Sequence, residues 1–119
     1  MRVTVGDTGL AGLLNSSASL TKTWPDAHRE AAMLIQILRI SDPSLADAMH
    51  IGLISLLTPT NGQARTHVAL GHKRAVLTAE ARDRKGDAID SPHKRPEEVE
   101  WLEVLDIAVA GLSATRTTG

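Results

Sequence analysis

Five histidines are the first residues to consider, because imidazole is a common metal ligand and acid–base catalyst. His67 and His72 are closest in sequence, but on a helix a spacing of five residues turns the second ring about 140° from the first. His28, His50 and His93 are isolated, the motifs HExxH and ExxH are missing, and the chain has no cysteine. The sequence therefore predicts no metal site, no thiolate chemistry and no disulfide.

Phosphate-loop and nucleophile motifs are also missing. Gly6, Gly9 and Gly12 recur at every third position, which differs from the GxGxxG spacing of a dinucleotide-binding loop, and no lysine closes the run. The nucleophile motif GxSxG does not occur. Acidic residues gather between Glu97 and Asp106, where a helix would present them to solvent opposite Trp101. We expect no catalytic residues and no cofactor.

Charge is unevenly distributed along a chain whose net charge is −1. Residues 65–85 hold six basic and two acidic side chains, whereas residues 86–119 hold seven acidic and three basic ones. A basic segment can bind nucleic-acid phosphates. The candidate residues are Arg65, Lys73, Arg74, Arg82, Arg84 and Lys85. On a helix these residues would surround the axis rather than form a stripe, and the chain has no Phe or Tyr for base stacking. The sequence leaves open whether these basic residues face solvent, face a partner or pair with the acidic segment.

Apolar spacing predicts that helices position these groups. In residues 25–40, Pro25 suits the first turn, and one apolar stripe follows helical periodicity. The stripe contains Ala27, Ala31, Leu34, Ile35 and Leu38. Met33, Ile37 and Ile40 form a second apolar strip on the same helix. Similar patterns predict helices over residues 43–57, 63–85 and 96–112.

The expected fold is an all-α, four-helix bundle-like domain with an irregular N-terminal arm. We place the arm or loop at residues 1–23, the helical domain at 24–114 and a frayed tail at 115–119. For residues 2–5 a short strand that pairs with another chain is the alternative. No apolar run reaches the roughly 20 residues of a membrane span, and no signal peptide is recognisable, so we expect a cytoplasmic protein.

The helices expected over residues 25–40 and 43–57 are apolar on nearly all sides. Two further helices cannot cover this much apolar surface. The sequence therefore favours a non-catalytic protein–protein interaction module, either a homo-oligomer or an accessory subunit of a larger assembly. The expected contact residues are Met33, Ile37 and Ile40, with Trp101 as an anchor. The alternatives are a nucleic-acid-associated regulator that uses residues 65–85, and an enzyme with a site between helices.

Overall fold

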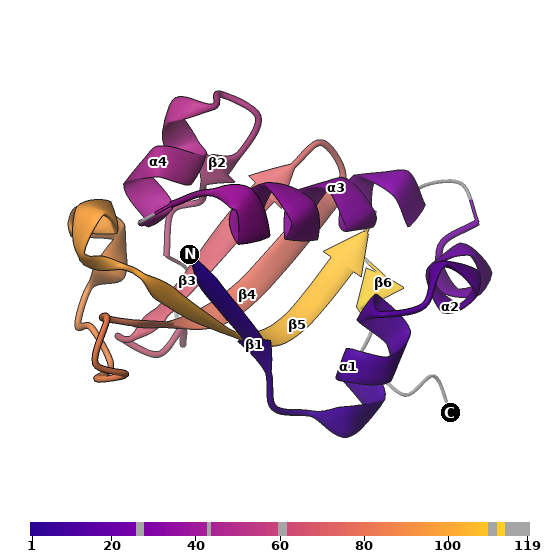
Figure 1. Ribbon diagram of the computed structural model, residues 1–119, viewed down its shortest axis with the longest axis horizontal. Coiled ribbons are helices and arrows are strands. Elements are labelled where there is room, and N and C mark those ends of the chain that lie inside the picture. The colour runs from indigo at the N-terminus through magenta and orange to yellow at the C-terminus, as the bar shows by residue number, and fades with distance from the viewer. Residues whose placement is uncertain (26–27, 43, 60–61, 110–111, 114–119) are drawn as a thin grey trace.

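A mixed β-sheet lies at the centre of the molecule, so the expected all-α helical bundle is wrong (Figure 1). The computed structural model describes residues 1–25, 28–42, 44–59, 62–109 and 112–113, and the expected frayed tail at 115–119 lies outside them. The strands are β1 (Arg2–Val5), β2 (Ser55–Leu56), β3 (His67–His72), β4 (Ala75–Arg82), β5 (Trp101–Val109) and β6 (Leu112–Ser113).

The strand order is β1-β5-β4-β3-β2, and β6 pairs with β5. Strands β2 to β5 form an antiparallel meander, whereas β1 runs parallel to β5. A parallel pair needs a long crossover, and here the whole chain between residues 5 and 101 separates the two strands. The N-terminal strand thus pairs with a strand of its own chain. The alternative, in which residues 2–5 pair with another chain, is therefore not needed to complete this strand.

The helices are α1 (Thr8–Leu14), α2 (Ser17–Thr23), α3 (His28–Ile40) and α4 (Leu45–His50), with 3-10 segments η1 (Pro92–Lys94) and η2 (Pro96–Glu98). The expected irregular N-terminal arm is therefore wrong, because residues 2–23 contain a strand and two helices. Local capping explains both helices. The Asp7 carboxylate accepts from the Leu10 N–H at 2.8 Å, and the Ser16 hydroxyl oxygen accepts from the Ser19 N–H at 3.2 Å.

Helix α3 covers one face of the sheet, and the core lies between them (Figure 1). Leu34 and Leu38 of α3 are fully buried together with Leu70, Leu77 and Leu102 of the sheet. The helix expected at 25–40 is confirmed over 28–40, including the burial of its apolar stripe at the described positions. Because the sheet buries this stripe, the packing of α3 requires no second chain.

The hairpin β3–β4 stands where a helix was expected over residues 63–85. Val68, Leu70, Leu77 and Ala79 are buried, and their immediate neighbours are half-buried, so the period is two. The many alanines of β4 favour helix intrinsically, but cross-strand pairing outweighs that weak preference. Lys73, at the turn, has a φ of +54°.

Strand β5 occupies most of residues 96–112, so the helix expected there is wrong, and a β-bulge explains why the sequence pattern looked helical. The pairing with β4 shifts between Thr78 and Ala79, which leaves Leu105 as the extra, exposed residue. The bulge breaks the alternation of apolar residues along β5. The resulting sequence spacing imitates a helical stripe, although Leu102 and Ile107 point into the core.

The helix expected over residues 43–57 is shorter than predicted. Helix α4 ends at His50, and Gly52 has a φ of +82°, which favours glycine after a helix C-terminus. The chain then continues into β2. Asp47 completes the first turn of α4, because its carboxylate accepts from the N–H and the hydroxyl of Ser44, each at 3.0 Å. These bonds lower the pKa of the Asp47 carboxyl below its usual value.

Candidate protein interface on the open sheet face

The sheet face opposite α3 is partly exposed, and we call it the open sheet face. The alternation that buries one set of side chains under α3 places the other set here. The open sheet face consists of Arg2, Thr4, His67, Ala69, Gly71, Val76, Thr78, Glu80, Arg82, Trp101, Glu103, Asp106 and Ala108. Strand register divides it into a flat end and a polar end.

The flat end contains small side chains on three adjacent strands. Gly71, Val76 and Ala108 are direct partners in one row across β3, β4 and β5. Leu57 lies over Gly71, since a Cβ atom on that glycine would be 3.5 Å from Leu57 Cδ2. Ala108 and Val76 are half-buried, so this small-residue surface stays accessible. It is a surface on which another flat element can pack closely.

The polar end begins with a row of four residues across four strands. His67, Glu80, Glu103 and Thr4 are successive partners in β3, β4, β5 and β1. Two glutamates directly opposite each other repel. The repulsion is offset because Arg82 pairs with Glu80 at 2.8 Å and the Thr4 hydroxyl donates to Glu103. The described residues contain no group of three potential metal ligands, so this row offers no metal site.

Trp101 occupies the next row of the polar end, between two arginines. The Arg2 guanidinium lies 3.9 Å from the ring centroid and the Arg82 guanidinium 5.5 Å from it. The indole N–H donates to the Thr4 hydroxyl oxygen at 2.7 Å. Arg82 also donates through Nη1 to the Gly86 carbonyl at 3.2 Å. A cation already covers the indole, so Trp101 is no free platform for a nucleic-acid base.

The structure does not bring the four expected partner-binding residues together. Met33 and Ile40 are exposed on α3, at 45% and 66%, whereas Ile37 is only 3% exposed and belongs to the core. Trp101 lies on the opposite side of the sheet from α3, because its neighbour Leu102 points toward that helix. Trp101 therefore belongs to the open sheet face, and Met33 and Ile40 belong to a different surface.

The candidate nucleic-acid residues are separated by the hairpin. Lys73 and Arg74 lie at its turn, whereas Arg82, Arg84 and Lys85 lie at the far end of β4, about 25 Å away along an eight-residue strand. Arg65 precedes β3 and lies at the same end as Arg82, because His67 pairs with Glu80. The structure thus divides the six residues between the two ends of the hairpin.

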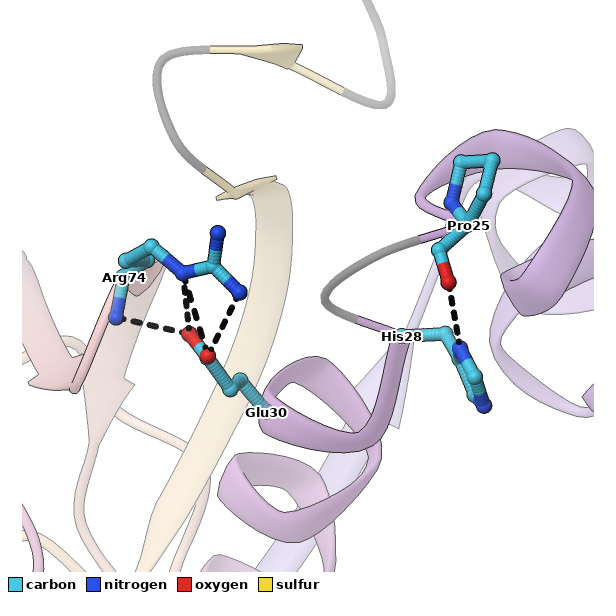
Figure 2. Close-up of polar contacts among 4 residues, drawn as sticks. All are labelled: Pro25, His28, Glu30 and Arg74. Atoms are coloured by element: carbon cyan, nitrogen blue, oxygen red, sulfur yellow. Dashed lines mark hydrogen bonds and ion pairs between the residues drawn. The ribbon is translucent and has the colours of Figure 1, made fainter.

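Three of these basic residues pair with acidic ones. Arg74 binds Glu30 with an Nη2–Oε1 distance of 2.9 Å (Figure 2), and Arg65 Nε lies 3.2 Å from Asp90 Oδ1. Arg82 pairs with Glu80, as described above. The guanidinium and then the backbone N–H of Arg74 lower the pKa of the Glu30 carboxyl below its usual value. Of these three pairs only Arg65–Asp90 joins the basic segment to the acidic residues 86–119, which was one of the possibilities left open; Glu30 and Glu80 lie outside that segment.

The small residues of the flat end were missed at the sequence level. Their signal is the period-two placement of Ala69, Gly71, Val76 and Thr78, which becomes visible only once a hairpin is assumed. The sequence alone could not place Ala108 on this face, because the bulge at Leu105 changes which residues of β5 point to each side of the sheet.

Compared with protein-family models, curated proteins and solved structures, the chain matches none. Within the described part of the chain, no helix has the length and apolar character that crossing a bilayer requires.

Proposed function

We propose that this chain is a non-catalytic protein-interaction module that associates with a second copy of itself through the open sheet face. The observation that carries the proposal is the flat end, where Val76 and Ala108 adjoin on an accessible sheet surface and the Leu57 side chain covers the neighbouring Gly71. An uncovered helix is not the support for this proposal, because the sheet buries the apolar stripe of α3 and leaves only Met33 and Ile40 of its large apolar side chains exposed among the described residues. Sheet faces pack on one another readily, with small side chains allowing a close approach.

A second copy fits the distribution of charge on this face. Arg2 and Arg82 stand beside Glu80 and Glu103, whereas Asp106 pairs with Thr78 nearer the flat end, so the surface carries both signs. A two-fold axis through the flat end stacks the two rows of small residues. It leaves both polar ends at the rim, which matches the apolar centre and polar rim of protein interfaces.

The size of the face predicts weak association. Four strands about 4.8 Å apart and about 20–25 Å long give roughly 500 Å² of contact per copy. Stable interfaces use about 800 Å² per partner. We therefore expect a dimer with a dissociation constant on the order of 0.1 mM rather than a permanent oligomer.

Sedimentation equilibrium from about 10 µM to about 1 mM tests this proposal over the expected range. The average mass should rise from near that of one 12.7 kDa chain toward twice that value. A monomer throughout the range contradicts self-association. A mass that exceeds a dimer and keeps growing also contradicts it, because two sheet faces in contact form a closed pair.

A further inference from the structure

A small cavity of about 150 Å³ lies beside the start of β3, between two loops. Its polar lining comes from Gln63, Arg65 and His67, where the chain enters β3, and from Ser91 and His93, at the start of η1. The loops are joined, because the Ser91 N–H donates to the Arg65 carbonyl at 2.8 Å and Arg65 pairs with Asp90. These contacts hold the lining residues in one place.

The lining is rich in hydrogen-bond donors. Arg65 carries five N–H groups and a permanent charge, each imidazole of His67 and His93 can donate, and Ser91 adds a hydroxyl. The Gln63 amide is already engaged, since its Nε2 donates to the His67 carbonyl at 3.1 Å. Two carboxylates lie beside this lining, and each is offset by an arginine: Asp90 pairs with Arg65, and Glu80, the cross-strand partner of His67, pairs with Arg82.

The surroundings of the cavity add positive charge. Lys94 and Arg95 follow His93 directly and are both exposed, and because Glu98 pairs with Arg95 at an Nε–Oε2 distance of 3.7 Å, the added charge is mainly that of Lys94. Arg65 is 82% exposed, so its guanidinium can contact a ligand without leaving Asp90. A cation would be repelled by this arginine, and the described residues contain no group of three metal ligands. The donor set instead matches a small oxyanion.

We infer that this cavity binds a small tetrahedral oxyanion, namely inorganic phosphate or the phosphoryl group of a small phosphomonoester. Arg65 supplies charge and paired N–H donors, and His67 donates from the same side at the start of β3, while His93 and the Ser91 hydroxyl donate from the opposite loop. This site does not depend on self-association, because its lining, apart from His67, lies outside the open sheet face.

Titration of the full chain with inorganic phosphate tests the inference directly, with the ring-proton resonances of the histidines as the readout. Protein concentration, pH and ionic strength are held constant, with sodium chloride as the balancing salt. The resonances of His67 and His93 should shift along one saturable curve, while those of His28 and His50 stay in place. Shifts that sodium chloride reproduces, or shifts that do not saturate, would overturn the site.

Two matched variants locate the site. Arg65→Gln should weaken phosphate binding at least fivefold, whereas Arg84→Gln removes an exposed arginine elsewhere and should leave it unchanged. Both positions are exposed, so both variants should fold. His93→Gln removes a second donor and should weaken phosphate binding independently of Arg65. Equal weakening by Arg65→Gln and Arg84→Gln would reduce the effect to general charge attraction and overturn the inference.

Two further ligands identify the source of the oxyanion. Glycerol phosphate that binds more tightly than inorganic phosphate assigns the cavity to phosphomonoesters, and the reverse order assigns it to the free ion; either order supports the site. Zn²⁺ that shifts His67 and His93 when neither phosphate does would mean that the cavity prefers a cation, and the inference would be wrong.

Discussion

Glu30 and Arg74 are 44 positions apart in the sequence, yet they join the first turn of α3 to the turn of the β3–β4 hairpin (Figure 2). The Glu30 carboxylate accepts from the Arg74 backbone N–H at 2.8 Å, from Nε at 3.1 Å and from Nη2 at 2.9 Å. This two-pronged geometry fixes direction as well as distance. The pair thereby sets how the helix lies along the sheet at the end of the molecule where the flat end begins.

The ion pair predicts a pH-dependent contribution to stability. Arg74 lowers the pKa of Glu30 in the folded chain below its usual value of 4.5, so the unfolded chain binds that proton more tightly. The contribution is therefore complete above the usual value and is lost as the pH falls through the lower, folded-state pKa. Urea unfolding of the parent chain and of Glu30→Gln should differ most at neutral pH and converge in acid.

A double-mutant cycle provides the control for the ion pair. In the Arg74→Gln background, Glu30→Gln should change the unfolding free energy much less than in the parent chain, because its side-chain partner is already gone. A difference between the parent and Glu30→Gln that stays constant down to strong acid would show that the two side chains are not coupled in solution.

Gly86 should not tolerate a side chain. Its φ is +94°, and a Cβ atom would lie 2.9 Å from Cζ3 of Trp101, whose ring is held by Arg2. Gly86→Ala should lower the unfolding free energy by more than about 1 kcal/mol. Gly12→Ala is the matched change, because Gly12 is exposed on α1 with open space around its Cβ position, and it should stabilise by about 0.5–1 kcal/mol. Urea midpoints that move in the same direction would contradict this local picture.

Thr4 should be important for the attachment of β1. Its hydroxyl accepts from the Trp101 indole and donates to Glu103, so Thr4→Val leaves an indole N–H without its acceptor while preserving the shape of the side chain. We expect a loss of about 1–2 kcal/mol and a change in the emission of Trp101, with the buried Trp24 unaffected. Thr58→Val, at an exposed position after β2, is the control. Equal effects of the two variants would argue against the Thr4 contacts.

Local sequence patterns predict α3 correctly but do not predict the sheet. In α3 the apolar stripe, the early acidic residue and the burial all follow from one stretch of chain, so periodicity predicts the helix. In β5 the bulge at Leu105 combines two strand phases into a pattern that resembles a helix. The parallel pairing of β1 with β5 depends on contacts almost a full chain apart, which no local pattern encodes.

The candidate interface was partly accessible from the sequence. Trp101 was expected on the face opposite the acidic residues, but it shares the open sheet face with Glu103 and Asp106, and its neighbours Arg2 and Arg82 come from other strands. The flat end requires the register of three strands to bring Gly71, Val76 and Ala108 together. Such a surface becomes visible only when the fold is known, because its residues are small and unremarkable along the chain.

Self-association through the open sheet face is tested by sedimentation of two charge-insertion variants at about 1 mM, a concentration above the expected dissociation constant. Val76→Lys places a cation in the flat end, and Met33→Lys places the same cation on the exposed side of α3. If the open sheet face joins two copies, Val76→Lys should sediment as a monomer with an unchanged thermal midpoint, while Met33→Lys still forms dimers. A dimer that survives Val76→Lys but is lost in Met33→Lys would move the interface to α3 and contradict the account.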